Sequence, residues 1–266
     1  MSSDQWFEFK AWMTHQIRAV GPHGVHSPFV YQLITEVLRR KNLPKSHEDI
    51  ESLRSDFIHN HASIDVADFG AGSRSSTEAR RKISSIARRA LQSANHARAL
   101  SALAAHAQAN HFLELGTSLG VTTHYLSRTS SAISINTIEG APSIASLAQE
   151  GFSALDRRNV KLWVGEFDEL LEEVLKSMPS VDFAIVDGNH RLEPTKKYVH
   201  QLLPYMNEHS VIVLDDIHWS PGMEEAWSHC RSLPEVTLSL DFFDFGVLYF
   251  LKGRRKEHFV LKRPWL

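Results

Sequence analysis

The chain has 266 residues, 42% hydrophobic and 23% charged, with a formal net charge of -2, so it is long enough for a sizeable core and has no positive field that favours nucleic acid. Its single cysteine, Cys230, excludes an internal disulfide and is typical of a cytoplasmic protein. No apolar run approaches the roughly 18 residues of a membrane span, and the first residues lack signal-peptide character, so no membrane partner is expected.

Residues 1–108 are predicted to be a helical N-terminal extension with a small strand and turn near 64–73. Ser27 is expected to cap a helix over Phe29–Arg39, because Pro28 stands at its first position. A long helix is predicted over Arg80–Gln108, which is rich in Ala, Arg and Leu.

Residues 109–266 are predicted to form an α/β domain, because apolar runs alternate with helical segments, as in a parallel sheet covered on both faces. The last two runs are separated by a short turn and read as an antiparallel hairpin, which gives a seven-stranded mixed sheet. The expected strands are Phe112–Leu115, Ile133–Glu139, Val160–Val164, Phe183–Asp187, Val211–Asp215, Val236–Leu240 and Val247–Leu251. The expected helices are Thr122–Arg128, Ser143–Ala154, Glu169–Lys176, Pro194–Leu203 and Met223–Cys230.

The stretch Phe112–Gly120, FLELGTSLG, predicts the site of a nucleoside cofactor. Gly116 and Gly120 follow an apolar strand, and the next strand ends on Glu139. Glycine lets the backbone turn tightly and lets a ligand approach closely, while a carboxylate at the second strand tip suits the two hydroxyls of a ribose.

A second glycine loop, Gly70-Ala71-Gly72, matches a nucleotide loop on its glycines alone. It is followed by a basic stretch, Arg80–Arg89, rather than by a strand with a terminal acid. We therefore interpret it as a tight turn and prefer the Gly116 loop for the cofactor. The basic stretch reads as a solvated helix face, so nucleic acid is not expected as a partner.

Further acids stand at the predicted strand tips, namely Asp187 and the pair Asp215-Asp216. The carboxyl ends of parallel strands meet at one sheet edge, so these acids are expected to converge. Crowded carboxylates repel one another, and a hard divalent cation such as Mg²⁺ relieves that repulsion. His190 follows Asp187 by three residues and is a candidate base for a hydroxyl proton. Helix capping for the acids and a surface position for His190 are the structural alternatives.

From about Asn110 to Leu251 the chain resembles the class I S-adenosylmethionine-dependent methyltransferases, and more narrowly the cation-dependent O-methyltransferases of the catechol and caffeoyl-CoA type. The matching motifs are LELGTSLG, TIEG, VGEFDE, IVDGNH and VLDDIHW. The resemblance implies a Rossmann-like sheet with an antiparallel last strand. It implies cofactor-binding roles for Glu114, Gly116, Thr117, Ser118, Gly120, Glu139, Gly140, Glu166, Phe167 and Asp187. It also implies metal-ligand roles for Asp187, Asp215 and Asp216, and catalytic roles for Asp187 and His190.

Two positions depart from the family pattern. Asp216 stands where the family usually has Asn, and His190 stands where catechol-type enzymes carry a lysine base. The segment His23–Leu33, HGVHSPFVYQL, resembles that of uncharacterised bacterial methyltransferases, and His26 or Tyr31 could face the pocket; the alternative is a capped apolar helix. His218 and Trp219 are further candidates for the pocket lining.

The leading hypothesis is methyl transfer from S-adenosylmethionine to a hydroxyl of a small-molecule acceptor, with a divalent cation assisting. Metal-independent transfer and a non-catalytic cofactor-binding or interaction protein are the alternatives. A nicotinamide dehydrogenase is less favoured, because the Gly-x-x-x-Gly loop suits a pyrophosphate poorly. A homodimer is the expected alternative to a monomer.

Overall fold

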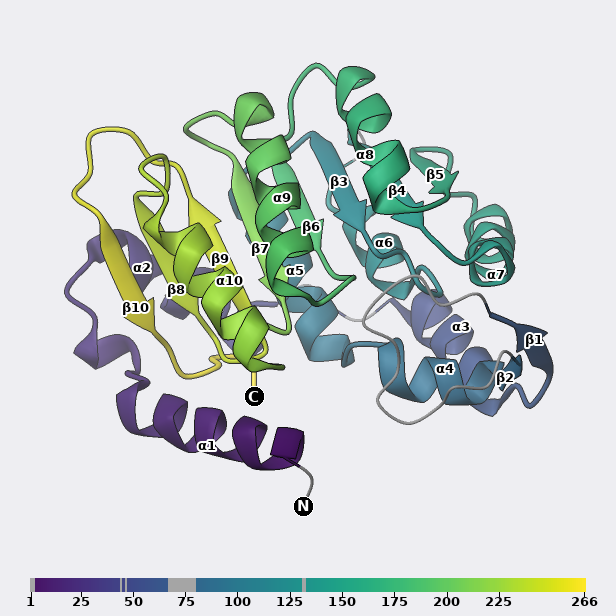
Figure 1. Cartoon of the computed structure of the whole chain (residues 1–266), viewed down its shortest axis with the longest axis horizontal. Helices are drawn as coiled ribbons and strands as arrows, with labels where there is room; N and C mark the ends of the chain where they lie inside the picture. Colours follow the sequence, from purple (N-terminus) through teal and green to yellow (C-terminus); the bar gives the residue numbers. More distant parts are fainter. Residues whose placement is uncertain (1–2, 44, 46, 67–79, 131–132) are drawn as a thin grey trace.

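The structure, a computed structural model, describes residues 3–43, 45, 47–66, 80–130 and 133–266. Its centre is an eight-stranded mixed sheet with the strand order β10-β8-β9-β7-β6-β3-β4-β5 (Figure 1). The strands are β3 His111–Leu115, β4 Ser134–Glu139, β5 Val160–Val164, β6 Phe183–Val186, β7 Val211–Asp215, β8 Leu238–Asp241, β9 Phe245–Tyr249 and β10 Glu257–Val260. A separate two-stranded antiparallel sheet pairs β1 Ser63–Asp65 with β2 Arg80–Lys82.

Helices cover both faces of the large sheet, as expected for parallel strands that are buried on both sides. In Figure 1, α8, α9 and α10 lie in front of the sheet, while α2 and α5 lie behind it. The α-helices are α1 Ser3–Arg18, α2 Pro28–Gln32, α3 Glu48–His59, α4 Ile83–Ala90, α5 Ala94–His106, α6 Val121–Leu126, α7 Pro142–Ala154, α8 Phe167–Lys176, α9 Leu192–Leu202 and α10 Pro221–Ser232. Short 3₁₀ turns are η1 Pro22–Gly24, η3 Arg40–Asn42 and η4 Leu203–Tyr205, and a π-helical turn is η2 Leu33–Val37.

The order of the strands places the crevice of the sheet beside β3. From β3 the chain adds β4 and β5 on one side, and then returns to add β6 and β7 on the other. In such sheets a ligand binds outside the carboxyl ends of the strands, at the point where the direction of addition reverses. The antiparallel β9 pairs with β7 and confirms the predicted hairpin with β8.

The sheet has one strand more than the seven predicted. Glu257–Val260 forms β10, which pairs in parallel with β8 at the edge. Its burial is only partial, and it directly follows the basic tail Lys252–Lys256. Short half-exposed edge strands have a weak hydrophobic pattern, which is why this one was not predicted.

Two predicted helices differ from the structure. The stretch Arg80–Gln108 is divided into β2, α4 and α5, because Ser93 caps a new helix by accepting a hydrogen bond from the backbone N–H of His96 at 3.2 Å. The helix predicted over Phe29–Arg39 is α2 followed by the π-helical η2, and the Ser27 side chain makes no capping hydrogen bond. The Gly70 and Gly72 loop lies outside the described residues.

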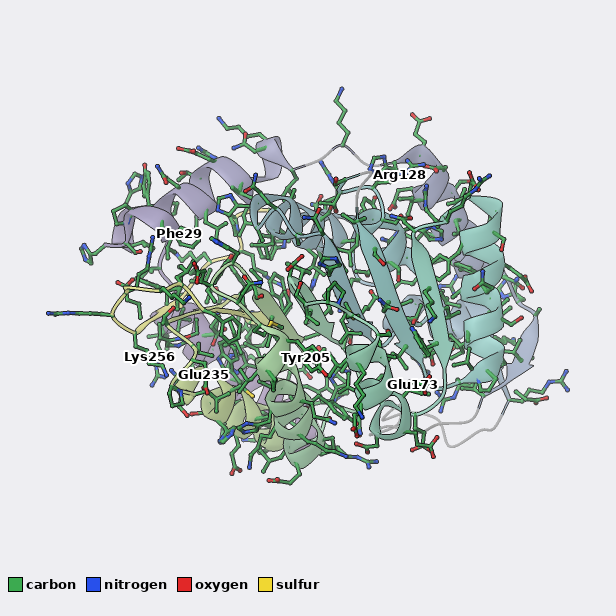
Figure 2. All side chains as sticks on the ribbon, turned by 90° about the horizontal axis from the view of Figure 1, so that it is seen from above. Phe29, Arg128, Glu173, Tyr205, Glu235 and Lys256 are labelled. Atoms are coloured by element: carbon green, nitrogen blue, oxygen red, sulfur yellow. The ribbon has the colours of Figure 1, made fainter. Side chains whose placement is uncertain are left out.

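The N-terminal extension packs onto the same core as the sheet. Val30, Leu33 and Leu38 are fully buried in the same hydrophobic cluster as residues of α5 and the sheet residues Phe112 and Phe183. Figure 2 shows Phe29 and Lys256 toward one end of the molecule and Glu173 toward the other. The hydrophobic core includes residues from both sides of the predicted domain boundary at residues 108 and 109, and that boundary stays a prediction. Among the described residues, no helix is both long and apolar enough to cross a membrane.

Candidate functional site

A cavity of about 500 Å³ lies at the carboxyl ends of β3, β4, β6 and β7. It brings together acids and glycines that are up to 100 residues apart in sequence, as the strand-tip argument predicts. The sequence-predicted residues that line it are Gly116, Ser118, Glu139, Gly140, Glu166, Phe167, Asp187, His190, Asp215, Asp216 and Trp219.

The loop between β3 and α6 has a backbone that only glycine suits at two positions. Gly116 has φ +104°, and a Cβ there would lie 1.8 Å from the carbonyl oxygen of Asp187. Gly120 has φ +75° and immediately precedes α6, where a Cβ would meet the Phe152 ring at 2.8 Å. The glycines thus allow the β3 loop to cross closely over the tip of β6 and then to enter a helix.

Glu114 and Thr117 lie behind the loop rather than in the cavity lining. Glu114 is 2% exposed, and its Oε2 accepts hydrogen bonds of 2.6 Å from the hydroxyls of Thr123 and Thr137. Burial raises the pKa of Glu114 to about 7, against the lowering effect of the two hydroxyls. Thr117 Oγ1 lies 2.6 Å from Thr137 Oγ1. These residues therefore fix the loop from behind.

Glu139 is held at the tip of β4 by the backbone of the neighbouring loops. Its Oε2 accepts a 2.8 Å hydrogen bond from the N–H of Ser118, and its Oε1 accepts one of 2.9 Å from the N–H of Ala141. Burial nevertheless raises its pKa. Each carboxylate oxygen has a second lone pair, so the oriented group can still accept two hydroxyl hydrogen bonds from a ligand.

Glu166 and Phe167 lie at the start of α8 and line the cavity beyond Glu139. The Phe167 ring contacts Tyr198 edge to face, with centroids 5.7 Å apart. A Cβ on Gly188 would meet this ring at 2.8 Å. The aromatic ring is thus fixed by α9 and by the β6 loop, and it supplies a flat apolar wall for a planar ligand group.

At the other end of the cavity His190 lies between two strand-tip acids. Its Nε2 is 3.6 Å from Asp187 Oδ1 and 3.8 Å from Asp216 Oδ2. Desolvation is the largest influence on Asp187 and raises the pKa of its carboxyl, and the charge of Asp216 adds to that rise. The three side chains come from the ends of β6 and β7, as predicted. An imidazole in this position can take a proton from a bound hydroxyl.

Asp215 is the most enclosed of the strand-tip acids, at 3% exposed. Gln92 Nε2 donates a 2.7 Å hydrogen bond to Asp215 Oδ2, and His96 Nε2 lies 3.8 Å from Oδ1. Desolvation, together with the charges of Asp187 and Asp216, raises the pKa of Asp215 well above its ordinary value. Burial lowers the pKa of His96 to about 3, so this imidazole is neutral and supplies no compensating charge.

Asp187 and Asp215 have the oxygen ligands that a cation site needs, but their side chains are not already arranged around a common point. In the described part of the chain, no group of three or more His, Cys, Asp or Glu side chains is arranged to hold a metal ion. Desolvation is the main cause that raises the pKa of Asp187 and Asp215, and among the described residues Asp215 Oδ1 is buried with no hydrogen-bond partner. Oxygen ligands of this kind fit a hard divalent cation.

Besides Glu114, Thr117 and Gly120, three further candidates from the sequence do not line this cavity. His218 lies beyond Asp216, where its Nε2 is 3.0 Å from Asp241 Oδ2 and its Nδ1 is 2.8 Å from Glu224 Oε1. His26 is also absent from the lining, and Tyr31 borders a different hollow beside Pro22. The alternative of a packed helix therefore describes the segment His23–Leu33 better than a cofactor cap does.

Gln92 and Arg89 are cavity residues that were not predicted. Both belong to the end of α4 and the link to α5, inside the stretch that the sequence pattern presented as one helix. A polar Gln-Ser pair at 92–93 followed by an Ala-rich run is a helix-start signal. That signal marks the break, but it does not show that the break faces the site.

Comparison with known proteins supports a methyltransferase fold. Residues 113–217 match the family described as "Methyltransferase domain". No curated protein sequence matches the chain significantly.

Solved structures share the fold at low sequence identity. The SAH-bound Podospora anserina methyltransferase PaMTH1 is 14% identical with a TM-score of 0.61, covering 85% of this chain and 97% of that one. The O-methyltransferase from Bacillus cereus in complex with SAH is 18% identical with a TM-score of 0.58, covering 84% and 97%. The Streptomyces achromogenes O-methyltransferase TomG, of tomaymycin synthesis, in complex with SAM is 19% identical with a TM-score of 0.53, covering 61% and 82%.

The glycine loop, the acid at the tip of β4 and the antiparallel β9 all lie where the resemblance requires them. Residues 113–217 thus match a methyltransferase domain, and the chain shares the fold of the solved methyltransferases.

Proposed function

We propose that the protein transfers a methyl group from S-adenosylmethionine to a hydroxyl oxygen of a small acceptor molecule. The observation that carries this proposal is the pairing of two chemistries in one cavity. Glu139 lies at one end, oriented to accept hydroxyl hydrogen bonds, and Asp187, Asp216 and His190 lie at the other. A donor that fills the first end leaves the second for the acceptor.

In this proposal Glu139 binds the ribose hydroxyls, Phe167 packs on the adenine, and the β3 loop around Gly116 faces the methionine part. The acceptor oxygen attacks the sulfonium methyl in line, so that a C–O bond forms as the C–S bond breaks and S-adenosylhomocysteine leaves. The protein contributes mainly by holding the two reactants in line. His190 Nε2 takes the hydroxyl proton, and the neighbouring carboxylates stabilise the resulting imidazolium.

Asp187, Asp215 and Asp216 are the residues that would hold a divalent cation. Such a cation, when bound, polarises the acceptor hydroxyl and lowers its pKa. The same structure leaves a second candidate, which is metal-independent transfer, because Gln92 already occupies Asp215 Oδ2. In that case Asp187 and Asp215 orient the acceptor directly.

Substitution of Asp215 tests the proposal. Asp215→Ala is expected to lower methyl transfer at least about 100-fold, because displacement of the acceptor by about 1 Å has that effect. Its affinity for S-adenosylhomocysteine should stay within about twofold, since Asp215 lies at the acceptor end. Transfer is measured with radiolabelled S-adenosylmethionine and a panel of phenols, catechols and hydroxy acids.

Chelation separates the two candidates. With the wild-type protein, loss of transfer in EDTA and recovery with Mg²⁺ would support the cation-assisted reaction. Transfer that is unchanged in EDTA would contradict the cation and favour the metal-independent reaction. Full activity of Asp215→Ala in the presence of EDTA would contradict both roles of this carboxylate.

A further inference from the structure

Gln92 places the N-terminal part of the chain in direct contact with the acceptor end of the cavity. Its side chain crosses from the α4–α5 link to Asp215, which lies 123 residues further along the chain, with an Nε2 to Oδ2 distance of 2.7 Å. Both residues line the cavity. Since Asp215 is 3% exposed, the bond is shielded from water, and a hydrogen bond in such surroundings is stronger than one at the surface.

The backbone of Gln92 is itself fixed by a chain of polar contacts. Arg54 of α3 donates from Nη1 to the carbonyl oxygen of Gln92. The same guanidinium donates from Nε to Glu51 Oε1 at 3.2 Å, and Glu51 Oε1 also accepts a 2.7 Å bond from the hydroxyl of Tyr125. Arg54 is 9% exposed and Tyr125, in α6, is 1% exposed. The position of Gln92 is thus tied to the helix that follows the cofactor loop.

The opposite oxygen of Asp215 has no such donor. Among the described residues, Oδ1 is buried without a hydrogen-bond partner. His96 Nε2 lies 3.8 Å from Oδ1 and is likewise buried without a hydrogen-bond partner. A buried carboxylate with one bonded oxygen is oriented by that bond, because the second oxygen then has only one place to lie. Gln92 therefore supplies the amide donor that orients the Asp215 carboxyl group, next to the Asp187 carboxyl group, which also shares a hydrogen bond with Asp215.

We propose that Gln92 is a positioning residue for methyl transfer, which acts through Asp215 and makes the N-terminal extension part of the acceptor site. The inference rests on the proposed function. Gln92 does not touch the donor in this account, and its contribution is the alignment of the acceptor. Two contacts fix the backbone next to this side chain. Arg54 binds the carbonyl oxygen of Gln92, and the next residue, Ser93, caps α5.

The test uses Gln92→Met, which keeps the length of the side chain and removes the amide donor. Gln149→Met is the matched control, since Gln149 is exposed on α7 outside the cavity. With the acceptor panel 4-hydroxybenzoate, 3,4-dihydroxybenzoate and glycolate, Gln92→Met is expected to lower kcat at least about tenfold. Its affinity for S-adenosylhomocysteine, measured by calorimetry, and its midpoint of thermal unfolding should stay close to those of the control.

A double-mutant cycle with Asp215→Asn separates positioning from a general structural effect. If Gln92 acts through Asp215, Gln92→Met should change kcat less than about twofold in the Asp215→Asn background. An undiminished effect there, or a Gln92→Met variant with the kcat of wild type, would overturn the inference while leaving the proposed function intact. Absence of transfer by the wild-type protein to every acceptor of the panel would instead contradict the proposed function, and the inference with it.

Discussion

At the scale of single residues, Glu139 shows most directly how the sequence leads to a binding site. Its carboxylate is oriented by two backbone N–H groups, that of Ser118 in the loop after β3 and that of Ala141 in the loop after β4. The strand tip positions the acid, and the glycine loop supplies one of the donors that orient it. The remaining lone pairs are then directed into the cavity before any ligand arrives.

Glu139→Ala should weaken binding of S-adenosylhomocysteine by about 10- to 100-fold. A hydrogen bond to a charged group contributes about 1.5–3 kcal/mol, and about 1.4 kcal/mol corresponds to a tenfold change in affinity. Glu150→Ala, at an exposed position of α7, is the control and should bind as the wild type does. Calorimetry that gives equal affinities for Glu139→Ala and the control would show that this carboxylate does not bind the ribose.

Glu114 is predicted to make stability depend on pH. Burial raises its pKa from 4.5 to about 7 in the folded protein, so the folded state favours the protonated form. The contribution of this group to the free energy of unfolding is therefore complete below about pH 4.5 and is lost as the pH rises through 7. The shift corresponds to a loss of at most about 3 kcal/mol.

Glu114→Gln removes this titration and keeps a carbonyl oxygen for Thr123 and Thr137. Denaturant unfolding at pH 5 and pH 8 should therefore show a smaller decrease of stability with pH for Glu114→Gln than for wild type. Glu150→Gln should retain the wild-type decrease. An identical pH dependence in Glu114→Gln and wild type would mean that Glu114 is ionised throughout this range in the folded protein.

At the scale of elements, the β3–α6 loop depends on close contact between two backbones. Gly116 lies at a positive φ and against the carbonyl of Asp187, whereas Gly253 lies at φ +72° with nothing within 4 Å of the point where a Cβ would lie. The two glycines therefore separate the conformational requirement from the steric one. A left-handed conformation alone costs an ordinary residue about 1–3 kcal/mol.

Gly253→Ala should destabilise the protein by about 1 kcal/mol, and Gly116→Ala by at least about 3 kcal/mol, since in the latter the backbone of β3 or β6 must also move. The free energies of unfolding are compared by denaturant titration. Gly116→Ala should in addition weaken binding of S-adenosylhomocysteine. Equal destabilisation by the two substitutions would show that the approach to Asp187 is not a constraint on the loop.

The sequence predicted the elements that form the site and missed those at the margins. The strands that end on Glu139, Asp187 and Asp215 were predicted because they are buried apolar runs with a polar residue at each tip, and their ends meet for geometric reasons. The edge strand β10 was not predicted, because its hydrophobic pattern is short and half of its residues are polar. Gln92 was not predicted either, because the approach of the α4–α5 link to β7 is a long-range contact without a local signal.

At the scale of the whole molecule, the N-terminal extension and the sheet form one hydrophobic core and jointly line the cavity. Helices α2 and α5 cover one face of the sheet, and the link before α5 reaches the tip of β7 (Figure 1). The domain matched by the methyltransferase family covers residues 113–217 and lacks Arg81, Arg89 and Gln92, which also line the cavity. The acceptor end therefore combines residues from the matched domain with residues that precede it.

Calorimetric titration of the protein with S-adenosylhomocysteine and, separately, with NAD tests the central claim most directly. We expect one binding site for S-adenosylhomocysteine per chain, weakened in Glu139→Ala, and no comparable binding of NAD. Tight binding of NAD without binding of S-adenosylhomocysteine would contradict it.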